Sequence, residues 1–90
     1  MNVKQYCIEI KKILTDVGES NWSKGFESFI LELNEAEDKS VYRKIISIYG
    51  GMGSFSDLVL YKDGILCKKE NDDLHKLRSE LYTEISNNWV

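Results

Sequence analysis

The sequence contains no proline, one histidine and two cysteines. The cysteines, Cys7 and Cys67, lie far apart in the chain and form no C-x-x-C pair. Zinc sites and disulfide frameworks rest on closely spaced ligands or several cysteine pairs. We therefore expect two reduced thiols, no bound metal and no cofactor.

Long apolar runs are also missing. A membrane span needs about 18 consecutive apolar residues, and a secretory signal needs an apolar segment of about 7 to 15 residues near the N-terminus. The sequence has neither. It therefore predicts a soluble cytoplasmic protein with no membrane partner.

Basic residues are in deficit rather than excess. Lys and Arg together number 12 against 15 Asp and Glu, which gives a formal net charge of -3. Binding to a phosphate backbone requires clustered Lys and Arg, so nucleic acid is not an expected partner, and a basic protein suits the chain better. With 42% hydrophobic residues, the 90-residue chain is expected to fold as a single domain, 1–90. The sequence does not indicate the oligomeric state of the protein.

Apolar residues recur at intervals of three and four along most of the chain. This spacing predicts helices over about 2–17, 21–36, 39–49 and 71–87. Trp22, Phe26 and Phe29 load one face of the second helix, which is expected to be the main contributor to the core. Gly25 lies inside that helix at a cost in helix propensity, so we expect another element to cross closely there. Asn71 or Asp72 is expected to cap the last helix.

Asp63-Gly64 lies between two apolar runs, and this pair is a strong signal for a type I′ hairpin turn. We expect strands over about 57–61 and 65–68, with Tyr61 opposite Leu66. Both faces of this ribbon would carry apolar groups, so at least one should be covered by helices. The predicted fold class is α+β, with four helices packed on one β-hairpin.

Three glycines, Gly50, Gly51 and Gly53, fall within four positions just before the hairpin. Phosphate-binding glycine loops run from a strand into a helix and often carry a lysine, whereas this segment runs from a helix into a strand. We interpret these glycines as a structural turn, with Asp63 and Gly64 as the turn of the hairpin. A small-molecule or anion-binding module using the loop from Gly50 to Asp57 is the alternative.

His75 and Cys67 are the candidates for chemistry. His75 lies close to acidic residues and could act as a base, but the sequence places no nucleophile beside it. Cys67 ends a predicted strand and is not a strong nucleophile candidate. An enzyme is therefore the least favoured class, and no catalytic residue is expected.

Acidic residues form two zones in the sequence. Such runs are most often solvated faces, but complementary charge also speeds encounter with a basic protein. On that basis we expect the partner contacts to be Glu32, Glu35, Glu37, Asp38, Asp72 and Asp73.

The segment Tyr49-Gly50-Gly51-Met52-Gly53-Ser54-Phe55-Ser56-Asp57-Leu58-Val59-Leu60 is followed by Asp63-Gly64, Glu70-Asn71, Leu74, Leu77 and Leu81-Tyr82. From Tyr49 to Tyr82 the chain resembles a small bacterial domain family of unknown function. Such small acidic domains also resemble the immunity proteins encoded beside secreted toxins, including those of contact-dependent growth inhibition. The resemblance implies a non-enzymatic protein that binds a cognate toxin, expected to be a nuclease, and neutralises it by occlusion.

Overall fold

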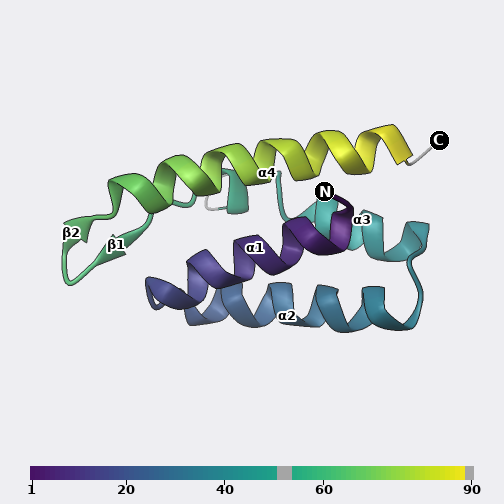
Figure 1. The fold of residues 1–90 in the computed structure, drawn as a ribbon, viewed down its shortest axis with the longest axis horizontal. Helices are drawn as coiled ribbons and strands as arrows, with labels where there is room; N and C mark the ends of the chain where they lie inside the picture. The colour runs from purple at the N-terminus through teal and green to yellow at the C-terminus, as the bar shows by residue number, and fades with distance from the viewer. Residues whose placement is uncertain (51–53, 89–90) are drawn as a thin grey trace.

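The structure is a computed structural model that describes residues 1–50 and 54–88 (Figure 1). It confirms the predicted α+β class, with four helices and one antiparallel hairpin. Gly51 and Gly53 lie outside the described residues. The elements in chain order are α1 (Val3–Asp16), α2 (Ser20–Glu35), α3 (Lys39–Ser47), the 3₁₀ turn η1 (Phe55–Asp57), β1 (Tyr61–Lys62), β2 (Ile65–Leu66) and α4 (Lys68–Asn88).

Helix α1 lies between α2 and α4 and packs against both (Figure 1). It supplies more buried side chains than any other helix: Val3, Tyr6, Cys7, Ile10 and Leu14. Helix α2 buries only Phe26 and Leu33. The expectation that the second helix dominates the core was therefore wrong, because α2 packs at the edge of the bundle and its other aromatics stay partly exposed.

Local signals fix several helix ends. Asn2 and Gln5 form a reciprocal capping box at the start of α1, and Gly18 after its end has φ of +80°. This left-handed conformation is typical of a glycine just after the end of a helix. Helix α3 ends at Ser47, before Gly50, and the backbone at Gly50 is not left-handed.

Among the described residues, no other element crosses closely at Gly25. A Cβ atom placed on Gly25 would meet nothing within 4 Å, other than atoms of its own helix and chain neighbours. No packing constraint therefore requires glycine at this position of α2.

Phe55 is a core residue that the sequence analysis did not identify. The chain enters η1 here, and the Phe55 side chain is fully buried. Its ring centroid lies 5.3 Å from that of Trp22, 5.0 Å from Phe26 and 5.6 Å from Tyr49. The segment after the glycines therefore delivers an aromatic side chain into the bundle, and the 3₁₀ turn replaces the expected start of the first strand.

The hairpin turn and register agree with the prediction. Asp63 and Gly64 have φ of 53° and 78°, and Tyr61 pairs with Leu66. The strands are only two residues each, and the ribbon extends from one end of the molecule (Figure 1). Only Leu60, just before β1, is buried. The expectation that helices cover at least one face of the ribbon was therefore wrong.

Asn71 explains how the chain enters this short ribbon. Its side-chain oxygen accepts a hydrogen bond from the Leu60 N–H at 2.8 Å, and its amide nitrogen donates to the Leu60 carbonyl at 3.0 Å. The same nitrogen donates to the Cys67 carbonyl at 2.9 Å. Neither Asn71 nor Asp72 caps α4, which begins earlier at Lys68. Asn71 acts instead as a substitute strand partner for Leu60.

Candidate functional site

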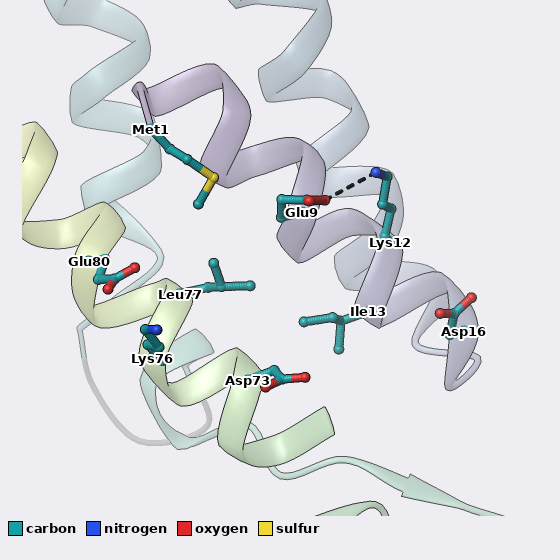
Figure 2. A pocket seen from close by; sticks show the side chains of 9 residues that line it. All are labelled: Met1, Glu9, Lys12, Ile13, Asp16, Asp73, Lys76, Leu77 and Glu80. Carbon is teal, nitrogen blue, oxygen red and sulfur yellow. Dashed lines mark ion pairs between the residues drawn. The ribbon is translucent and has the colours of Figure 1, made fainter. Parts of the chain in front are cut away.

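An open groove of about 420 Å³ runs between α1 and α4 (Figure 2). Ile13 from α1 and Leu77 from α4 point toward each other across it, and both are partly buried against the core. Met1 lies at one end. The groove therefore has an apolar floor built from the two helices.

Charged side chains form the rim of this α1–α4 groove, and acids outnumber lysines. The lining carboxylates are Glu9, Asp16, Asp73 and Glu80, and the lining ammonium groups are Lys12 and Lys76. Lys12 lies 3.1 Å from the carboxylate of Glu9, so that pair is neutral overall. The remaining rim carries three acids against one lysine, which gives it a negative potential.

The groove continues toward the hairpin. A neighbouring hollow of about 310 Å³ shares Ile13, Asp16 and Asp73 with it and adds Cys67 and Lys62, among others. The Lys62 ammonium group donates to the Asp16 backbone carbonyl at 3.4 Å, which ties the hairpin to the end of α1. This hollow adds Lys62, Lys69 and Glu70 to Asp16 and Asp73, so three acids face two lysines at the base of the hairpin.

Large apolar side chains are exposed on and beside the hairpin. Val59 is 48% exposed, Tyr61 55%, Ile65 72% and Leu66 51%. We call these four residues the hairpin patch. Tyr61 and Leu66 are paired and share one face of the ribbon, whereas Ile65 is paired with Lys62 and points to the other face. Exposed apolar side chains gathered at one end of a domain often mark an interface. The patch and the groove together give this end of the molecule the features of a docking surface.

The two predicted acidic zones do not meet. Glu32, Glu35, Glu37 and Asp38 lie where α2 leads into α3, whereas Asp72 and Asp73 lie near the start of α4, at the opposite end of the molecule (Figure 1). Asp73 also lines the groove. One continuous acidic face therefore cannot include both zones.

Three of the four acids in the α2–α3 zone make internal contacts. Glu32 lies 2.5 Å from the Lys44 ammonium group, and Glu37 accepts a hydrogen bond from the Tyr42 hydroxyl. Asp38 caps α3, and hydrogen bonds from Ser40 and then Val41 lower the pKa of its carboxyl. These contacts give Glu32, Glu37 and Asp38 roles in folding that need no partner.

The candidates for chemistry are not brought together. Cys7 is buried, and this burial raises the pKa of its thiol to about 12. Cys67 lines the hollow at the base of the hairpin, whereas His75 lines a different one. Among residues 1–50 and 54–88, no His, Cys, Asp and Glu side chains form a cluster able to hold a metal ion.

Sequence reasoning missed most of the groove acids. Glu9 and Asp16 are seven positions apart on α1, and Asp73 and Glu80 are seven positions apart on α4. Seven residues correspond to about two helical turns, so each pair lies on one side of its helix. This spacing beside an apolar stripe was present in the sequence, but only the packing of α1 on α4 shows that the two pairs line one groove.

No helix in the described ranges has the length and apolar character needed to cross a membrane. Neither the curated proteins nor the solved structures include a significant match to this chain. A family model described as a domain of unknown function (DUF6966) matches residues 15–68, more than half of the chain. The match starts and ends earlier than the resemblance seen from Tyr49 to Tyr82, and it takes in α2, α3 and the hairpin. The chain therefore belongs to the DUF6966 family.

Proposed function

We propose that this chain is a non-enzymatic immunity protein that binds a cognate bacterial toxin and neutralises it by occlusion. The observation that carries the proposal is the exposed hairpin patch beside the acidic end of the α1–α4 groove. The partner is expected to be a basic nuclease of the kind used in contact-dependent growth inhibition.

The hairpin patch supplies the apolar part of such an interface. Interfaces draw most of their affinity from a few large side chains that become fully desolvated, and Tyr is enriched among them. Tyr61 and Ile65 are more than half exposed, so they have apolar area to bury on a partner. The turn at Asp63 and Gly64 has positive φ at both positions, as a type I′ turn requires, and sets the backbone of the ribbon that carries these side chains. A backbone formed before binding lowers the entropy cost of binding.

The groove supplies the electrostatic part. A nuclease must bind a phosphate backbone and therefore presents Lys and Arg around its active site. Asp16, Asp73 and Glu80 offer such a surface complementary charge, as does the net charge of -3. Covering the nuclease surface would suffice for inhibition, so the proposal requires no catalytic residue.

A hairpin variant tests the apolar part. The double variant Ile65→Ser with Leu66→Ser should bind the proposed cognate toxin about 100-fold more weakly, because two interface anchors are lost. Isothermal titration calorimetry measures the affinity. Leu31→Ser is the matched control, since Leu31 is 58% exposed but lies on α2. Unchanged affinity in the double variant, or an equal loss in the control, would contradict the proposal.

Charge reversal distinguishes the two acidic zones. Asp16→Lys with Asp73→Lys should slow association with the toxin about tenfold at low salt, because the attraction that steers encounter is reversed. Glu35→Lys, at the opposite end of the molecule, should change the rate little. If Glu35→Lys slows association and the groove variant does not, the toxin docks at the α2–α3 end instead.

A further inference from the structure

A second hollow, of about 400 Å³, lies on the face of α4 that points away from the α1–α4 groove. Its lining residues are Tyr49, Ser56, His75, Arg78, Ser79 and Tyr82. The groove uses Asp73, Lys76, Leu77 and Glu80 of the same helix. At 100° per residue these two sets of α4 positions fall on opposite sides. We call this second site the Arg78 hollow.

Arg78 is held in place by the fold. Its Nη1 atom donates to the Phe55 carbonyl at 3.0 Å and to the Leu58 carbonyl at 3.1 Å. Its guanidinium carbon also lies 6.0 Å from the centre of the Phe55 ring. A guanidinium has five N–H donors in a planar fork, so these contacts orient the group and leave donors for a ligand.

Burial affects the charge of Arg78. The Arg78 side chain is partly buried, and this burial lowers the pKa of its guanidinium, whereas the charge of Asp57 acts in the opposite direction. Asp57 therefore offsets part of the cost of desolvating this cation. An anion bound at Arg78 would stabilise the charged guanidinium further.

The rest of the lining suits the same type of ligand. None of the lining residues is acidic, and His75, Ser56 and Ser79 add further polar groups. The rings of Tyr49 and Tyr82 meet edge to face at 5.3 Å and form an aromatic wall. The Tyr49 hydroxyl donates to the Arg78 backbone carbonyl, so this wall is fixed to α4.

We propose that the Arg78 hollow binds a small oxyanion, a phosphate or carboxylate group, held by Arg78 with His75 and Ser79 beside it. Guanidinium forks match the geometry of both groups. The site is separate from the toxin-docking end, so the inference goes beyond the proposed function and stands or falls without it.

Titration of the full chain with inorganic phosphate, without toxin, tests the site. His75 is the only histidine, so its ring C–H proton resonances are uniquely assigned in an NMR spectrum. At constant ionic strength these resonances should shift and saturate at millimolar phosphate. Acetate is titrated in parallel, and the tighter ligand of the two identifies the oxyanion. No saturable shift with either ligand would overturn the proposal.

Matched variants localise the binding. Ser79→Glu places a carboxylate in the hollow and should weaken binding about tenfold or more, since charge-assisted hydrogen bonds are lost to repulsion. Ser86→Glu adds the same charge on α4 outside the hollow and should leave the affinity unchanged. Both serines are exposed, so both variants should fold. An equal effect of the two substitutions would show that only net charge matters and would overturn the site.

Discussion

Asn71 shows at the scale of one residue how a side chain replaces a strand. It makes three hydrogen bonds to the backbone of Leu60 and Cys67. Asn71→Ala should therefore lower the free energy of unfolding by about 1–3 kcal/mol, because partly buried backbone groups lose their partners. Urea denaturation measures the change. Asn34→Ala, at an exposed position of α2, should cost little, and an equal loss in both variants would contradict the role of Asn71.

Substitution of Gly25 by alanine is expected to have the opposite effect and to stabilise the fold. It lies within α2, and a Cβ atom there would meet no heavy atom from another element within 4 Å. Gly25→Ala should raise the free energy of unfolding by about 1 kcal/mol through helix propensity. Gly18→Ala should lower it, because Gly18 has φ of +80°. Thermal and urea unfolding should show opposite signs for the two, and a loss of stability in Gly25→Ala would contradict the structure around α2.

The burial of Cys7 predicts that the stability of the fold depends on pH. Burial raises the pKa of its thiol to about 12, so the folded state favours the protonated form. This contribution to stability is complete below the thiol's ordinary pKa and is lost as the pH rises through that pKa toward 12. The urea midpoint should therefore fall above about pH 9. Tyr42 and Tyr49, whose pKa values are also raised, add to the same fall. In Cys7→Ala the fall should be shallower, and equal slopes would contradict this assignment.

Residue-scale prediction from sequence succeeded where the cause is local. Asp63 and Gly64 adopt positive φ because that turn requires it, and Gly18 ends α1 for a similar reason. The roles of Phe55 and Asn71 depend on side chains from other elements. Nothing in the neighbouring sequence specifies those contacts, so Phe55 was missed and Asn71 was assigned the wrong role, that of a helix cap.

The hairpin is the element whose packing departs most from expectation. Its strands are exposed, and Leu60 just before β1 is fully buried. Ile65→Ser and Leu66→Ser should each change the free energy of unfolding by no more than about 0.5 kcal/mol. Leu60→Ala should lower it by about 2–5 kcal/mol, because Leu60 is fully buried. Chemical denaturation of the three variants checks this, and a large cost for either serine variant would mean that the ribbon belongs to the core.

Helix periodicity identified all four helices, because each buries a stripe of apolar residues. Element boundaries were less accurate near the hairpin. The 3₁₀ turn at Phe55–Asp57 shortens the first strand, and α4 starts at Lys68 because Asn71 serves the hairpin instead of the helix cap. Both changes in element boundaries depend on tertiary contacts, and the spacing of apolar residues along the sequence does not specify such contacts.

The candidate site belongs to the scale of the whole molecule. Sequence reasoning named Asp73, but the groove exists only because α1 packs on α4 and brings Asp16 and Glu80 into the same rim. Judged by charge along the sequence alone, the α2–α3 zone was as good a candidate for partner contacts as the acids of α4. That zone lies at the opposite end of the molecule from the start of α4 (Figure 1). Helix packing, which the sequence pattern did not specify, therefore decides which acids can act together.

Inhibition by occlusion has a direct signature in stoichiometry. The nuclease activity of the proposed cognate toxin is measured while the chain is titrated against it at concentrations well above the dissociation constant. Activity should fall linearly and reach zero at one equivalent. Ile65→Ser with Leu66→Ser should abolish this sharp end point, while Leu31→Ser should preserve it. Persistent activity at excess protein, or inactivation by far less than one equivalent, would contradict occlusion.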